Sequence, residues 1–118
     1  MIYTSYYNRR DKGEGKYIAI SRTFPKWLSK EDYVHLPCIS PSHELRERYK
    51  NKEIDFNTFC NLFFKELKLE DIERLIVEIP QEGDCYILCH EKNQYDCHRY
   101  VISSILNKIG YTCEEYGR

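Results

Sequence analysis

Apolar residues recur along this chain with two spacings, one typical of strands and the other of helices. Short runs of strand-forming residues occur at Ile2–Tyr7, Tyr17–Ser21 and Cys85–Cys89, and a last one lies within residues 111–116. The run at Cys85–Cys89 has no polar interruption, which is typical of a strand that is covered on both faces in a parallel sheet. The pattern therefore predicts about four strands, most of them parallel.

Helical spacing governs the middle of the chain and the segment before its last strand. Ser40 followed by Pro41 predicts the start of one helix, and Asp55 predicts the cap of the next. A third helix is expected to end before Pro80, and a fourth to end at Gly110. The expected core residues on these helices and on the third strand are Phe59, Phe63, Leu67, Ile87, Ile102 and Ile105.

The order strand, strand, helices, strand, helix, strand predicts an α/β fold. We expect a small three-layer, Rossmann-like sheet of about four mostly parallel strands flanked by helices, formed by a single domain over residues 1–118. Residues 22–40 contain Pro25 and Pro37 and show no period. A long connection with at most one helical turn is expected there.

Composition limits the possible functions. The chain has 118 residues, 42% of them apolar and 31% charged, with a formal net charge of -1. Overall charge thus gives no reason to expect binding to nucleic acid or to a membrane surface. The sequence has no apolar run of about 18 residues and no apolar stretch near its start, so a cytoplasmic protein is expected. Its six cysteines are then expected to be reduced thiols.

Reactive side chains gather in the sequence CHEKNQYDCHR at residues 89–99. Cys97, His98 and Arg99 are expected to open the last helix, with Asp96 as its cap. A helix N-terminus offers unpaired N–H groups to an anion, and an arginine adds a planar fork suited to phosphate or carboxylate. The same position lowers the pKa of a thiol, so Cys97 is a candidate nucleophile with His98 as its base.

Further polar groups are expected to join this site. The ends of parallel strands lie at one edge of a sheet, where ligands bind in open α/β folds. The candidate ligand-binding residues at that edge and in the 89–99 segment are Ser5, Tyr6, Asn8, Arg9, Ser21, Arg22, Lys26, Glu91, Lys92 and Arg99.

Structural alternatives exist for the same residues. In the structural alternative, Cys97 only packs against the loop, and Arg99 forms an ion pair with Glu91 that holds the loop in place. A metal site at Cys89, Cys97 and His98 lacks a clear fourth ligand, so no metal or other cofactor is expected. The phosphatase pattern of Cys, five residues and Arg is absent, since Cys89 and Arg99 are ten positions apart.

Several motifs resemble the domain of unknown function 488 (DUF488) family of bacteria, archaea and phages. The strongest is YILCHEKNQYDCHRYVISSILNKIG, which is similar to the family's strand, Cys-x-Glu-Lys, loop, Cys-His-Arg and helix. IYTSYY, YIAISRTFPKW and HLPCISPSHELRERYKNKEIDFNTFCNLF resemble other family segments in the same order. The resemblance implies a small three-layer α/β domain. Its motif positions are Ser21, Arg22, Pro25, Lys26, Glu91, Lys92, Cys97, His98 and Arg99.

Three functions fit these observations. The first is binding of a phosphate-bearing small molecule or nucleic acid at the strand ends, with or without catalysis. The second is a thiol-dependent enzyme that uses Cys97 and His98 on an anionic substrate. The third is a non-catalytic protein that binds a partner protein, as a small regulator or a phage-encoded inhibitor. The sequence leaves the oligomeric state open.

Overall fold

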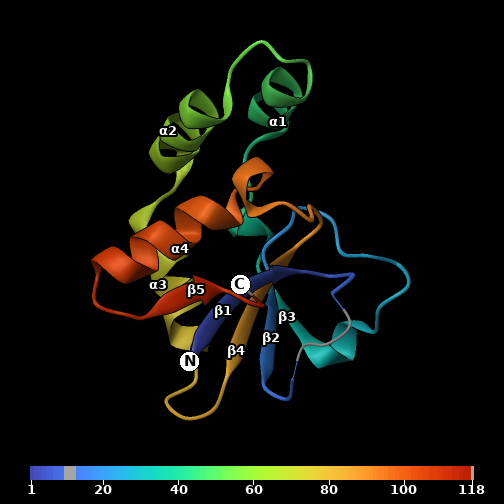
Figure 1. Cartoon of the computed structure of the whole chain (residues 1–118), viewed down its shortest axis with the longest axis vertical. Coiled ribbons are helices and arrows are strands. Elements are labelled where there is room, and N and C mark those ends of the chain that lie inside the picture. Colours follow the sequence, from blue (N-terminus) through green and yellow to red (C-terminus); the bar gives the residue numbers. More distant parts are fainter. Residues whose placement is uncertain (10–12, 118) are drawn as a thin grey trace.

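Five parallel strands form one sheet in the computed structural model of the chain, which describes residues 1–9 and 13–117. In spatial order they are β3 (Tyr33–His35), β2 (Lys16–Ala19), β4 (Cys85–Cys89), β1 (Ile2–Tyr6) and β5 (Cys113–Glu115) (Figure 1). Strand β4 is central, because both Ser5 of β1 and Ala19 of β2 pair with its Leu88. The carboxyl ends of β1, β2 and β4 therefore share one edge of the sheet, as the sequence predicted.

Four α-helices connect the later strands in the described ranges. Helices α1 (His43–Lys50), α2 (Phe56–Glu66) and α3 (Leu69–Glu78) join β3 to β4, and α4 (Arg99–Lys108) joins β4 to β5. Asp55 caps α2 as predicted, since its carboxylate accepts the Thr58 N–H at 2.8 Å. The predicted cap of α1 was wrong. Ser42 takes that role instead of Ser40, because its hydroxyl accepts the Leu45 N–H and a 3-10 turn, η2 (Pro37–Ile39), precedes it.

The connection at residues 22–40 holds more structure than the sequence predicted. It contains the edge strand β3 and the 3-10 turns η1 (Lys30–Asp32) and η2. The three residues of β3 pair with Tyr17, Ile18 and Ala19 of β2. A strand of three residues is too short to show an alternating pattern, which is why the sequence did not reveal it.

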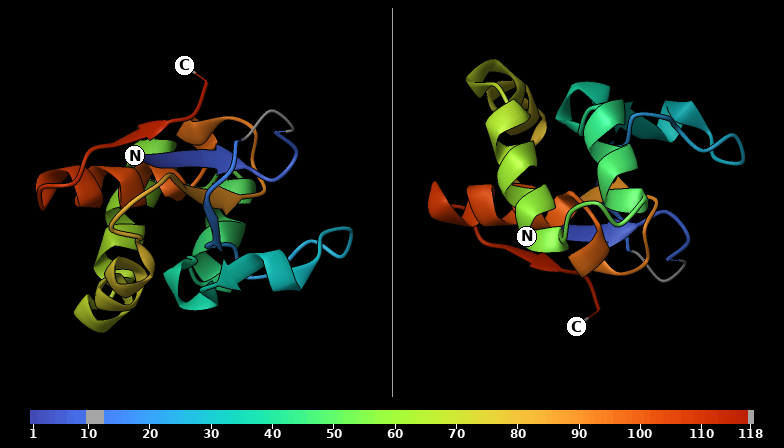
Figure 2. Two further views of the ribbon diagram at one scale, coloured as in Figure 1. Left: turned by 90° about the horizontal axis from the view of Figure 1, so that it is seen from below. Right: turned by 90° about the horizontal axis from the view of Figure 1, so that it is seen from above.

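The two faces of the sheet differ in what covers them. The crossovers that contain helices, from β3 to β4 and from β4 to β5, run in the same direction across the sheet. Parallel crossovers are right-handed, so all four helices lie on one face (Figure 2). Half-buried aromatic side chains and loop residues cover the other face, among them Tyr3, Tyr17, Phe24, Tyr33 and Tyr116. The α/β class is confirmed, with aromatic and loop residues rather than an α-helix as the outer layer on this second face.

The core lies between the helices and the sheet. Phe59, Phe63, Ile87 and Ile102 are buried there, as predicted. Leu67 and Ile105, also predicted as core, are partly buried and pack against the same cluster. None of the helices in the described residues is both long and apolar enough to span a bilayer.

Truncation of Phe63 tests this packing. Its side chain is fully buried beside Phe59 and His98, whereas its neighbour Phe64 is 60% exposed. Phe63→Ala is expected to lower the free energy of unfolding by about 3–5 kcal/mol, because it leaves a cavity. Phe64→Ala is the matched control and is expected to cost less than about 1 kcal/mol. Urea unfolding of both variants measures the difference, and similar losses would contradict the placement of α2.

Candidate functional site

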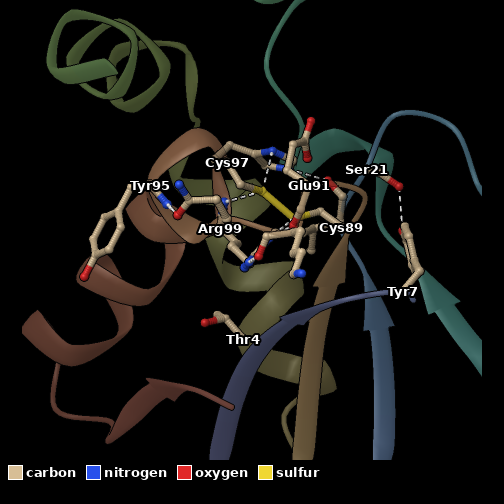
Figure 3. The surroundings of a disulfide bond; sticks show 12 residues. Thr4, Tyr7, Ser21, Cys89, Glu91, Tyr95, Cys97 and Arg99 are labelled. Atoms are coloured by element: carbon tan, nitrogen blue, oxygen red, sulfur yellow. Dashed lines mark hydrogen bonds between the residues drawn. A yellow bond between two sulfur atoms is a disulfide. The ribbon is translucent and has the colours of Figure 1, made fainter. Parts of the chain in front are cut away.

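A disulfide bond between Cys89 and Cys97 lies at the carboxyl end of the central strand (Figure 3). Cys89 is the last residue of β4, and Cys97 follows the 3-10 turn η3 (Gln94–Asp96). Both residues are at most 1% exposed. The expectation of reduced thiols was therefore wrong for this pair, because the β4–α4 loop brings the two sulfurs together across eight positions.

The guanidinium of Arg99 lies beside this bond and is completely buried. Nη1 donates to Cys89 Sγ at 3.2 Å and to the carbonyl of Glu91. Nη2 donates to the Lys92 carbonyl at 3.0 Å. The Glu115 carboxylate accepts from Nε at 3.0 Å and from Nη2 at 2.8 Å. Each of the five N–H groups of the arginine thus has a partner within the protein.

The partner carboxylate of Arg99 is supplied by β5. Glu115 is mostly buried, with 10% of its side chain exposed, and it also accepts the hydroxyl of Thr4 at 2.8 Å. Burial of the ion pair is tolerated because every charged atom is hydrogen-bonded. The ion pair that the sequence suggested, Arg99 with Glu91, does not form among these contacts: Glu91 offers its backbone carbonyl and not its carboxylate.

Helix α4 begins two residues later than predicted. His98 is its N-cap, Asp96 belongs to η3, and Cys97 has extended backbone angles. Cys97 Sγ accepts the Arg99 N–H at 3.4 Å, and the Cys97 carbonyl accepts the Tyr100 N–H. The carbonyl of His98 accepts the next two N–H groups. The first four N–H groups of α4, those of residues 99–102, are therefore already hydrogen-bonded inside the protein.

The imidazole of His98 is buried between β2 and the disulfide. Its Nε2 lies 2.8 Å from the carbonyl of Ile20, which can only accept, so Nε2 carries the proton. The other nitrogen, Nδ1, faces Cys97 Sγ at 3.8 Å. Burial lowers the pKa of His98 to about 4, so the ring is neutral near pH 7 and Nδ1 can accept a hydrogen bond from a thiol.

Cys89, Cys97 and His98 also bring three potential metal ligands within 4.8 Å of one another. A zinc site with three protein ligands needs an open fourth position. Here the Arg99 guanidinium donates to Cys89 Sγ, so a metal cation would lie beside a fixed positive charge. The surroundings suit an anionic sulfur better than a cation.

A cavity of about 460 Å³ opens on the helix side of His98. Helix α1 forms one wall, and the loop that follows β4 contributes Glu91 and Asp96. The cavity is lined by Pro41, His43, Arg46, Glu47, Tyr49, Lys50, Phe59, Glu91, Asp96 and His98. Sequence reasoning missed the cations of α1, although the spacing of His43, Arg46 and Lys50 places them on one helix face.

Only part of the predicted ligand set converges on the disulfide. The predicted residues that lie around the disulfide are Cys97, His98, Arg99, Glu91 and Lys92, the last through its carbonyl. Ser21 follows Ile20, whose carbonyl holds His98, but the Ser21 side chain is turned away from the disulfide. Its hydroxyl is hydrogen-bonded to the Tyr7 hydroxyl (Figure 3) and donates to the Thr23 carbonyl.

The remaining predicted residues lie elsewhere. Arg22 donates to the Pro41 carbonyl at 2.8 Å, and Arg9 lies over the ring of Tyr116 on the face without helices. Ser5 is buried, and its hydroxyl has no hydrogen-bond partner among the residues that the structure describes. The other three occupy the end of β1 or exposed loop positions; they are Tyr6, Asn8 and Lys26.

Comparison with known proteins places the chain among related sequences. The model of the family described as "Active DUF488-N3 subclade" matches residues 1–110. The "Uncharacterized protein YeaO" of Escherichia coli (strain K12) is 24% identical over 107 residues, which cover 87% of this chain and 93% of that protein. No solved structure matches.

Removal of the Arg99 side chain tests its role in the site. Arg99→Ala is expected to lower the free energy of unfolding by about 3–5 kcal/mol, because it leaves the buried Glu115 carboxylate without its partner. Lys16 provides the control, since its ion pair with Glu78 is about one-third exposed. Lys16→Gln should cost about 0–1 kcal/mol. Thermal or urea unfolding would contradict the assignment if the two substitutions cost the same.

Proposed function

This chain belongs to the DUF488 family, and we propose that it is a thiol–disulfide oxidoreductase with Cys89 and Cys97 as its reactive pair. The observation that carries the proposal is the hydrogen bond from the buried Arg99 guanidinium to Cys89 Sγ at 3.2 Å. A disulfide with a purely structural role needs no cation beside one of its sulfurs. A cation there stabilises the thiolate that forms when the disulfide opens.

The proposed reaction is thiol–disulfide exchange in two steps. The thiolate of a substrate attacks Cys97 Sγ, the bond between Cys97 and Cys89 breaks, and Cys89 leaves with the electron pair as a thiolate. A second substrate thiolate attacks the mixed disulfide, which releases the oxidised substrate and the Cys97 thiolate. Two substrate thiols are thus oxidised to one disulfide, and the protein disulfide is reduced to two thiols.

The roles of the two cysteines follow from their neighbours. Cys89 is the better leaving group, because Arg99 is within hydrogen-bond distance of its sulfur. Cys97 is the sulfur under attack, and once its thiolate has taken up a proton from solvent, Nδ1 of the neutral His98 can accept a hydrogen bond from the Cys97 thiol. The sequence assigned catalysis to Cys97 and His98 and overlooked Cys89.

The family description calls this subclade active and names no reaction. A reversible couple also fits the cytoplasmic location that the sequence suggested, where disulfides are transient and catalytic. Binding of a phosphate-bearing ligand is the competing proposal. Its support from Arg99 and the α4 amides is weak, because these donors already have internal partners.

The pKa of Cys89 in the reduced protein tests the proposal. Burial raises the pKa of the four cysteines outside the pair, to about 11 for Cys60 and Cys85, so these four thiols stay protonated near neutral pH. Titration of thiolate absorbance is expected to show one group with a pKa below the usual value of about 8.5. That group should disappear in Cys89→Ser and persist in Cys97→Ser.

Arg99→Lys is the companion variant, because it keeps a charge but loses the planar fork that reaches Cys89 Sγ. The pKa of the low group should rise in it. A titration in which no thiolate of the reduced wild-type protein forms below about pH 8.5 would contradict the oxidoreductase proposal. Thermal stabilisation by nucleotides or by inorganic phosphate, without thiol reactivity, would favour the phosphate-binding alternative.

A further inference from the structure

The cavity beside His98 is the place from which a substrate would approach the disulfide. Cys89 and Cys97 are at most 1% exposed, and His98 is 7% exposed. His98 is one of the residues that line the cavity, and its Nδ1 faces Cys97 Sγ at 3.8 Å. His98 thus touches both the cavity and Cys97, and its side chain has to turn aside before a thiol in the cavity can reach that sulfur. A volume of about 460 Å³ suits a small molecule rather than a folded protein.

The charges of the cavity lie on two walls and are only partly neutralised. On the α1 wall, Glu47 lies 3.9 Å from His43, while the side chain of Arg46 has no hydrogen bond or ion pair within residues 1–9 and 13–117. On the loop wall, Asp96 accepts the Tyr49 hydroxyl.

Glu91 is a second acidic residue on the loop wall of the cavity. Its backbone carbonyl holds Arg99, and its carboxylate has no ion pair to any described residue. Arg46 thus lines one wall of the cavity, and Glu91 lines the other. Arg46 matches a ligand carboxylate, and Glu91 matches a ligand ammonium group.

We infer that the substrate of this site is a low-molecular-weight thiol that carries an α-amino-acid group, with its carboxylate on Arg46 and its ammonium group on Glu91. The inference rests on the proposed thiol–disulfide exchange and adds the class of substrate. The thiolate of such a molecule attacks Cys97 Sγ, and Cys89 leaves as the thiolate.

Rates of disulfide reduction by two probes test this assignment. L-cysteine carries both charged groups, and 2-mercaptoethanol carries neither. Each probe is mixed with oxidised protein, the reaction is quenched by alkylation, and mass spectrometry measures the opened Cys89–Cys97 bond. Rate constants are expressed per thiolate, so that the different pKa values of the probes do not affect the comparison. The wild-type ratio of the two rate constants is expected to favour cysteine by about a hundredfold, because each of its two charged groups contributes about tenfold.

Arg46→Gln and Glu91→Gln are each expected to lower this ratio about tenfold. Arg48→Gln is the matched control, because Arg48 is also on α1 but lines a different hollow with Leu62 and Glu66. Its ratio should equal that of the wild type. Cysteamine and 3-mercaptopropionate separate the two charges: cysteamine should respond to Glu91→Gln alone, and 3-mercaptopropionate to Arg46→Gln alone.

The results distinguish failure of the inference from failure of the proposed function. Equal rate constants per thiolate for cysteine and 2-mercaptoethanol in the wild type would overturn the substrate class. So would a ratio that Arg46→Gln and Arg48→Gln lower to the same extent. If neither probe opens the Cys89–Cys97 bond, the oxidoreductase proposal itself fails, and the inference fails with it.

Discussion

The buried charge of Arg99 is the constraint on which the rest of the site depends. A fully buried guanidinium is stable only if its donors are all satisfied, and this one draws its partners from three parts of the chain. Two carbonyls come from the β4–α4 loop, the sulfur from the end of β4, and the carboxylate from β5. The same contacts that satisfy the charge fix the loop against the sheet and hold Cys89 and Cys97 together.

The order of the strands makes this arrangement possible. Strand β1 lies between β4 and β5 and places Thr4 where its hydroxyl bonds the same carboxylate as Arg99. Because every strand is parallel, the ends of β1, β4 and β5 meet at one edge, and the short loop after β4 folds over it. Glu115, 16 positions beyond Arg99, can therefore become its nearest acid.

The sequence predicted the parts of the fold that depend on local pattern. The parallel placement of β1, β2 and β4, the Asp55 cap and the burial of Phe59 and Phe63 followed from runs and periods within single segments. Contacts between distant segments had no such signal. The pairing of Cys89 with Cys97, and of Arg99 with Glu115, depends on how the loop and β5 fold back over the strand end.

The 89–99 segment, where the sequence placed the candidate site, contains the disulfide and the buried arginine, but the contacts within it differ from the expected ones. An arginine at a helix start favours an external anion when its donors face solvent. Here the helix begins at Arg99 itself, its side chain points into the protein, and its charge faces a sulfur. Local sequence shows that an arginine is present but not which way it points. The cations that face the open cavity come from α1 instead.

The central claim is that Cys89 and Cys97 form a reversible redox couple. The most direct measurement is the fraction of this disulfide at equilibrium in buffers with a graded ratio of reduced to oxidised glutathione. We predict one cooperative two-electron transition that is the same from the reduced and the oxidised side, at a less negative potential than the values below about −300 mV of structural disulfides. A pair that stays fully oxidised in excess reduced glutathione, or fully reduced in excess oxidised glutathione, would contradict the account.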